Sequence, residues 1–133
     1  KDIATILKSW KEKNIGAHKV MLMGTKPNTD VLFSLLKETF SKVLNIYRSN
    51  DTLIELAPKS VSKLSAIEKL LKENETLKNV ISFGDNYNDI EMLQHTGCGI
   101  AVDNAREEVK KIANGVTLKN TENGVAHYIK QHL

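Results

Sequence analysis

Residues 79–93 read NVISFGDNYNDIEML, and the organisation of the whole chain can be worked out from them. A short apolar run over 80–83 stops at Gly84, a cluster of acids and amides follows, and apolar residues then recur at helical spacing. This pattern predicts a strand, a tight turn and a helix. In open α/β sheets ligands bind beyond the carboxyl ends of the strands, so we expect this turn to carry a functional site.

Side chains that bear oxygen gather at the predicted turn. Asp85 would stand at the tip of the strand, and Asn88 and Asp89 would fall in the first turn of the helix. Gly84 would allow a sharp turn and the close approach of another group. Two carboxylates and a carboxamide form a hard-oxygen site suited to Mg²⁺. Helix capping would account for one acid, but not for the pattern Gly-Asp-x-x-Asn-Asp directly behind an apolar strand.

Signals for helices and strands alternate from residue 61 to the end of the chain. Such alternation predicts a parallel sheet flanked by helices, which is an α/β fold. The expected elements are helices 62–74, 86–95, 105–113 and 123–132 and strands 79–83, 98–102 and 115–118.

Lys63 is an unusual residue for its place in this pattern. Ser62 is a good N-cap, so Lys63 would occupy the first helical position. A cation there opposes the helix dipole by roughly 0.3–1 kcal/mol. Two interpretations stay open at this point. Either the lysine is simply solvated, or it acts with the free amides of the helix terminus to bind an anion such as phosphate.

The segment before residue 61 follows a different pattern. The expected elements are a helix over 2–13, a strand over 18–23, a helix with its apolar face over 31–40, and a hairpin of strands 42–48 and 52–56. Asn28 or Thr29 would cap the second helix. An antiparallel sheet with helices on one face is the natural packing of these elements. We therefore predict two segments, 1–60 and 61–133, with a boundary near 57–61.

The composition is that of a globular domain. The 133 residues are 41% hydrophobic and 26% charged, with a formal net charge of +3. Lysines are spread along the chain and aromatic residues are few, so we expect no nucleic-acid surface. No apolar run approaches the roughly 20 residues of a membrane span, and no signal peptide is visible, so we expect a cytoplasmic protein without membrane contact. The single cysteine, Cys98, excludes an internal disulfide.

These residues resemble the haloacid dehalogenase (HAD) superfamily, and within it the Cof-type branch of sugar-phosphate and related phosphatases. The stretch 84–93 is similar to the acidic metal motif of that family, and Val61-Ser62-Lys63 is similar to its lysine motif. The stretches 99–110 and 123–126 also resemble the family. The resemblance implies that residues 61–133 form the C-terminal part of a Rossmann-like HAD core, and that residues 1–60 form part of the α+β cap domain inserted into it.

The resemblance also implies a role for each site residue. Asp85 would bind Mg²⁺ directly, and Asp89 would support the metal site through water or a hydrogen bond. Asn88 would hydrogen-bond the phosphoryl group or position the ligands of the metal. Lys63 would neutralise the phosphoryl oxygens and the nucleophile. The expected catalytic residues are thus Lys63, Asp85 and Asp89, and the substrate would be a small phosphorylated metabolite. Phosphoryl transfer needs charge neutralisation and alignment above all, which a metal and a lysine supply.

The chain departs from the family pattern in two places. Ser60 and Leu64 stand where the family often has glycine around the lysine motif. The N-terminal Asp-x-Asp-Gly-Thr motif, which holds the nucleophile, has no counterpart in the sequence. We therefore expect a portion of a phosphatase with an aspartyl-phosphate mechanism that is inactive by itself. The alternative is a non-enzymatic module derived from that fold, which binds phosphate, Mg²⁺ or another protein.

The absent motif has a structural consequence in the family fold. There the strand that precedes Gly84 lies beside the strand that carries the nucleophile, so this chain would leave one edge of the sheet unpaired. Exposed strand edges invite pairing with another chain. We expect self-association, an exchanged strand, or a companion N-terminal segment at this edge.

Overall fold

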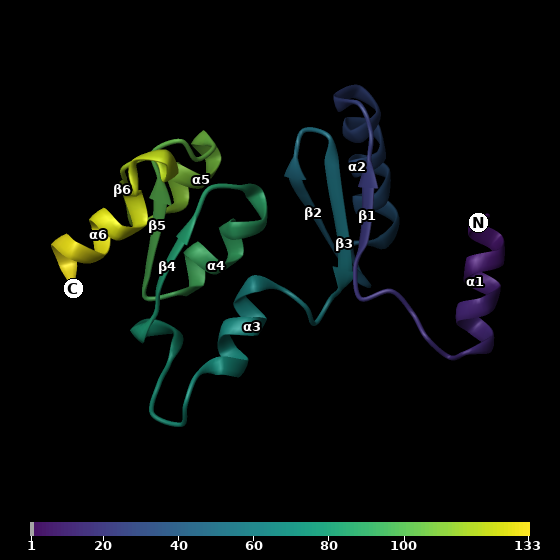
Figure 1. Ribbon diagram of the computed structural model, residues 1–133, viewed down its shortest axis with the longest axis horizontal. Coiled ribbons are helices and arrows are strands. Elements are labelled where there is room, and N and C mark those ends of the chain that lie inside the picture. The colour runs from purple at the N-terminus through teal and green to yellow at the C-terminus, as the bar shows by residue number, and fades with distance from the viewer. Residues whose placement is uncertain (1) are drawn as a thin grey trace.

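The computed structural model describes residues 2–133 and contains two three-stranded sheets, which lie on different sides of the molecule (Figure 1). The first sheet is antiparallel in the order β1-β3-β2, with β1 over Val20–Met23, β2 over Leu44–Asn50 and β3 over Leu53–Pro58. The second is parallel in the order β4-β5-β6, with β4 over Ile81–Gly84, β5 over Cys98–Val102 and β6 over Gly115–Thr117. The predicted α/β class and the parallel sheet are confirmed.

Only one of the two helices predicted for the first segment covers its sheet. Helix α2 (Lys26–Phe40) contacts β2 and β3, and Ile54 is fully buried in the sheet. Helix α1 (Ile3–Glu12) forms as expected but stands apart from the sheet in Figure 1, and none of its residues is buried. The expectation of helices packed on one face was therefore wrong for α1. Helical spacing of apolar residues predicts an amphipathic helix, but it does not specify the surface against which that helix packs.

Helix α2 begins earlier than the predicted caps. Thr25 stands at the N-cap and makes no side-chain capping bond, and Pro27 lies in the first turn. Proline suits this place because its φ angle is already helical and its missing N–H would have had no partner there. Thr29 is instead buried inside the helix, where its hydroxyl donates to the Thr25 carbonyl over 2.8 Å. The prediction that Asn28 or Thr29 caps the helix was wrong.

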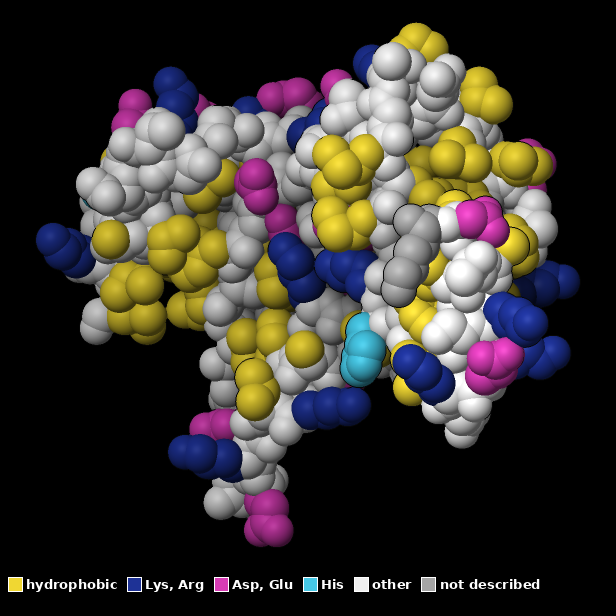
Figure 2. All heavy atoms as spheres, turned by 45° about the vertical axis from the view of Figure 1, so that its right-hand side comes forward, with side chains coloured by type: hydrophobic (Ala, Val, Ile, Leu, Met, Phe, Trp, Pro, Cys, Tyr) yellow, Lys and Arg dark blue, Asp and Glu magenta, His cyan; other side chains and the backbone are white. Residues whose placement is uncertain are grey.

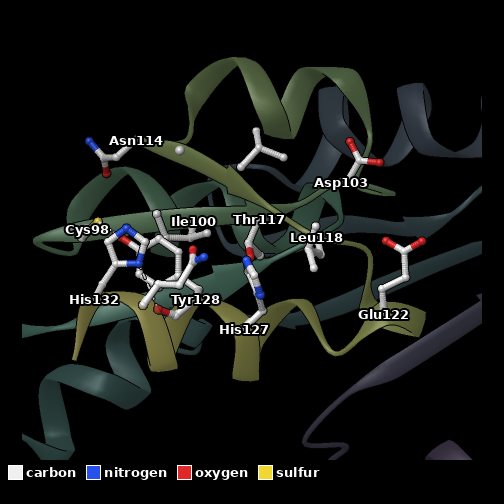
Figure 3. Close-up of a pocket in the computed structure, with 13 residues that line it drawn as sticks. Cys98, Ile100, Asp103, Asn114, Thr117, Leu118, Glu122, His127, Tyr128 and His132 are labelled. Atoms are coloured by element: carbon white, nitrogen blue, oxygen red, sulfur yellow. Dashed lines mark hydrogen bonds between the residues drawn. The ribbon is translucent and has the colours of Figure 1, made fainter.

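Helices cover both faces of the parallel sheet. The helices that contact its strands are α4 (Ile90–His95), α5 (Glu107–Ile112) and α6 (Gly124–His132), and α3 (Lys63–Leu70) packs against α4. Three 3₁₀ turns accompany them, over Leu77–Asn79, Tyr87–Asp89 and Asn120–Glu122. The core packs Met92 and Leu93 of α4 and Val109 of α5 against Ala101 of β5. Figure 3 shows α5 on one side of β5 and β6, and α6 on the other.

Two helix boundaries differ from the predictions by four residues each. The helix expected over 62–74 ends at Leu70, where Leu71 turns to an extended conformation as the C-cap, and the polar stretch 72–76 then leads into the 3₁₀ turn over Leu77–Asn79. The helix expected over 86–95 begins as the 3₁₀ turn Tyr87–Asp89 and becomes α-helical only at Ile90. Both differences lie at helix ends, where local hydrogen bonds compete with the helical pattern.

The chain passes from the first sheet to the helices and strands of the second between Pro58, where β3 ends, and Lys63, where α3 begins. Asn45 fixes this junction, because its side-chain amide donates to the carbonyls of Lys59 and Val61 over 3.1 and 2.9 Å. The assignment of residues 1–60 and 61–133 to a partial cap and a core stays a prediction.

Three further features concern the surface and its surroundings. Within residues 2–133 no helix is both long and apolar enough to cross a bilayer. Strand β4 pairs with β5 on one side only, so in the part of the chain described here its other edge has no strand partner. Apolar side chains also lie exposed on the first segment, including Met21 and Met23 of β1, and Figure 2 shows such side chains over this part of the molecule.

Candidate functional site

Asp89 is the organising residue of the loop that follows β4. Its side chain is only 3% exposed. One carboxylate oxygen accepts the backbone N–H groups of Asp85 and Asn86 over 3.0 and 3.1 Å. The other accepts the ammonium of Lys63. Because a buried carboxylate without partners is costly, these three donors are what allow Asp89 to be charged in the interior.

Gly84 makes room for the carboxylate of Asp89. A Cβ atom added at Gly84 would lie 2.5 Å from the Cβ of Asp89, which no ordinary packing allows. Its φ angle is not positive, so the backbone itself does not require glycine here. The glycine is needed for the close approach of Asp89, which was one of the two reasons that the sequence suggested.

Lys63 stands at the first position of α3, as the sequence predicts. Ser62 is the N-cap, and it exchanges hydrogen bonds with Ser65 in a capping box, over 2.8 and 3.0 Å. The ammonium of Lys63 pairs with Asp89, and half of the lysine side chain remains exposed. A protein carboxylate thus offsets the cation at this helix terminus, while the exposed half leaves Lys63 accessible to a ligand.

The two acids of the loop differ in their electrostatics. Burial alone would raise the pKa of Asp89, but the hydrogen bonds from Lys63 and from two amides outweigh it and hold that pKa below its usual range. Asp85 lies at the surface, but a partial loss of surrounding water, and then the negative charge of Asp89, raise its pKa. Asp89 is therefore the anchored anion, and Asp85 is the exposed carboxylate on which a cation would relieve the repulsion.

Asn88 and Lys63 line one cavity of about 250 Å³ between the two sheets. Its polar wall is completed by Tyr47 and Glu55 of the first sheet and by Lys19, which directly precedes β1. The Lys19 ammonium lies 2.5 Å from the Glu55 carboxylate and lowers the pKa of Glu55. None of these three residues was predicted from the sequence. The hairpin register pairs Tyr47 with Glu55, so their shared face was the one available signal.

A larger cavity lies away from the predicted residues. It has a volume of about 550 Å³ and is formed by β5, β6 and α6 (Figure 3). The rings of Tyr128 and His132 stack there with their centres 4.1 Å apart, and the Cys98 sulfur lies 3.6 Å from the Tyr128 hydroxyl. None of the residues that the sequence singles out for chemistry lines this cavity.

The loop offers ligands that fit a hard cation only in part. Among residues 2–133 no three side chains of His, Cys, Asp or Glu are grouped closely enough to hold a metal. Both oxygens of Asp89 already accept hydrogen bonds, which leaves Asp85 as the exposed carboxylate of the loop. Carboxylate oxygen is the donor type that Mg²⁺ prefers. The charge of Asp89, which adds to the effect of lost water on the pKa of Asp85, is one that a cation would offset.

The fold and this loop correspond to a known family, because a family model described as haloacid dehalogenase-like hydrolase matches residues 1–129. The chain belongs to this family. It is 33% identical over 133 residues to the 5-amino-6-(5-phospho-D-ribitylamino)uracil phosphatase YcsE of Bacillus subtilis, covering 96% of this chain and 53% of that protein. It is 42% identical over 91 residues to the phosphatase YwpJ of the same organism, covering 68% of this chain and 32% of YwpJ.

A solved structure agrees with the family membership. A haloacid dehalogenase-like hydrolase from B. subtilis matches with a TM-score of 0.80 and 33% identity, over 87% of this chain and 41% of that one. The resemblance inferred from the motifs is therefore confirmed. The chain spans between a third and about half of the length of the curated relatives YwpJ and YcsE.

The geometry of the loop predicts that its two acids contribute very differently to stability. Asp89→Ala removes the acceptor of two backbone amides and of Lys63, so we expect the free energy of unfolding to fall by about 2–4 kcal/mol. Asp85→Ala removes an exposed carboxylate that is repelled by Asp89, so we expect a change within about 0.5 kcal/mol. Urea denaturation of the two variants measures both values. Equal losses in the two variants would contradict the role given to Asp89.

Proposed function

We propose that the whole protein is a Mg²⁺-dependent phosphomonoester hydrolase that acts on a small phosphorylated metabolite. The observation that carries the proposal is the meeting of Lys63 and Asp89, which brings the lysine motif and the acidic motif to one place although 26 residues separate them. The relatives YcsE and YwpJ are named phosphatases, and the first carries a phosphorylated substrate in its name.

The residues of this chain would share the work of binding and orienting a phosphoryl group. Lys63, half exposed at a helix N-terminus, would hold the phosphoryl oxygens together with the free amides of α3. Asn88 lines the same cavity and would donate its amide to the phosphoryl group. Asp85 would bind Mg²⁺, with Asp89 fixing the shape of the loop around it. The metal would add positive charge to neutralise the phosphoryl oxygens.

The nucleophile would have to come from outside this chain. The other aspartates have local roles: Asp2 caps α1, Asp30 and Asp51 pair with arginines, and the carbonyl of Asp103 accepts a bond from Lys110. None of them lines the cavity of Lys63 and Asn88. The chain by itself would thus hold half of the site, the half that binds phosphate and metal.

A second candidate is a module without enzymatic activity that binds phosphate, Mg²⁺ or another protein. The unpaired edge of β4 and the incomplete set of acidic ligands favour it for this polypeptide alone. Calorimetric titration with Mg²⁺ and inorganic phosphate separates a half-site, which retains affinity for both ions, from a module that binds only another protein.

The isolated chain is predicted to be inactive. With p-nitrophenyl phosphate and Mg²⁺, residues 1–133 should release nitrophenol no faster than buffer, because the nucleophile is missing. Clear turnover that is lost in Asp85→Ala would contradict this prediction.

In the full-length protein, Lys63→Met should lower kcat/KM by roughly two orders of magnitude or more, because it removes the charge that faces the phosphoryl oxygens. The matched control is Lys69→Met, which removes a lysine from the last turn of the same helix and should leave kcat/KM unchanged. Equal effects of the two substitutions would overturn the role proposed for Lys63.

The free edge of β4 is predicted to pair with another strand. Sedimentation of the isolated chain should therefore show concentration-dependent dimers or larger species, because the outer backbone groups of β4 have no strand partner within residues 2–133. Monomers at all concentrations, together with rapid amide exchange over 81–84, would rule out pairing at this edge.

A further inference from the structure

Arg106 connects two parts of the molecule that are far apart in the sequence. It precedes α5, and its backbone N–H donates to the carbonyl of Asp85 over 3.1 Å. Its side-chain Nε donates to the Oδ1 of Asn86 over 2.9 Å, and an Nη2 group lies 3.3 Å from the Oδ1 of Asp51. Its guanidinium also lies over the ring of Tyr87, 4.8 Å from the ring centre. One side chain thus contacts the loop after β4 and the turn between β2 and β3.

Asn86 strengthens the same connection. Its amide nitrogen donates to the backbone carbonyl of Ser49 at the end of β2. Its oxygen accepts the backbone N–H of Tyr87 over 2.9 Å as well as the Arg106 side chain. The guanidinium of Arg106 therefore holds the rotamer in which Asn86 reaches Ser49. The hairpin turn, residues 49–52, and the loop after β4 are joined at two points, Asn86 to Ser49 and Arg106 to Asp51. Arg106 contributes to the first by holding Asn86 and forms the second itself.

The hairpin turn is itself held by local polar bonds. Asn50 accepts the backbone N–H of Thr52 over 2.8 Å, and Arg48 donates to the carbonyl of Asp51 over 2.9 Å. These bonds hold the turn in one conformation, and the backbone N–H of Gly24 donates to the carbonyl of Thr52 over 3.0 Å, which ties the turn to the first sheet. The side chains of Arg106 and Asp51 are 30% and 50% exposed, so their ion pair is weak enough to open and close readily.

We propose that Arg106 is a positioning residue that latches the hairpin turn, residues 49–52, onto the loop that carries Asp85. Separation of the first sheet from the second at this point would then occur together with loosening of the loop after β4, residues 84–89. When the latch is closed, Asn86 is bonded both to Arg106 and to Ser49 of the hairpin. The loop is then held by the hairpin as well as by Asp89. If the protein has the function proposed above, the latch has a further consequence: it would keep the loop in its binding geometry while the first sheet covers the site.

Amide hydrogen exchange of the isolated chain tests the latch without reference to activity. In Arg106→Leu, which keeps an apolar side chain beside Tyr87, exchange should accelerate roughly three- to tenfold in both 48–53 and 84–89. Strand β5 should keep its protection, which excludes global unfolding. The matched control is Lys110→Leu, which removes a cation from α5 that pairs with Glu107 instead. It should leave both segments unchanged.

The same experiment separates a latch from a purely local role. Acceleration confined to 84–89, or no acceleration in either segment, would overturn the proposal.

A thermodynamic cycle adds a second criterion. Asp51→Asn alone should accelerate both segments by less than Arg106→Leu, and Asp51→Asn added to Arg106→Leu should produce little further change, because the ion pair is already lost. Additive effects would show that the two residues act independently and would contradict the latch.

Discussion

The structure of the site depends on one ion pair, between the ammonium of Lys63 and the buried carboxylate of Asp89. A buried, charged aspartate is stable only when its oxygens accept hydrogen bonds. Asp89 accepts two from backbone N–H groups of its own loop and one from the ammonium of Lys63, at the start of a distant helix. The pair therefore fixes the distance between α3 and the loop after β4. It also keeps a positive charge at a helix N-terminus, where the helix dipole alone would disfavour it.

Several other features follow from this buried carboxylate. Glycine is required at position 84, because any side chain there would displace Asp89. The two acids of the loop acquire opposite pKa shifts, which makes one an anchor and leaves the other available to a cation. Half of Lys63 stays exposed beside Asn88, at a cavity whose other wall belongs to the first sheet. Arg106 and Asn86 then link the loop to that sheet from a second direction.

The sequence predicted the features that depend on local patterns. Apolar runs and turn residues placed all six strands, and the Gly-Asp-x-x-Asn-Asp pattern placed the loop, because both are encoded within a few neighbouring residues. The sequence did not predict the separation of α1 from the sheet, because an amphipathic pattern does not specify the surface against which the helix packs. It also missed Tyr47, Glu55 and Arg106, whose roles arise only when residues 20 to 60 positions apart in the sequence meet in the fold.

The most direct test of this account is a titration of the aspartate carboxyl carbons by ¹³C NMR in the wild-type chain and in Lys63→Met. We expect Asp89 to titrate below the usual aspartate range and Asp85 above it. It also predicts that the pKa of Asp89 rises when Lys63 is replaced, because the strongest of its favourable partners is lost. If Asp89 titrates at the ordinary value and does not respond to Lys63→Met, the ion pair does not hold the site together and the account is wrong.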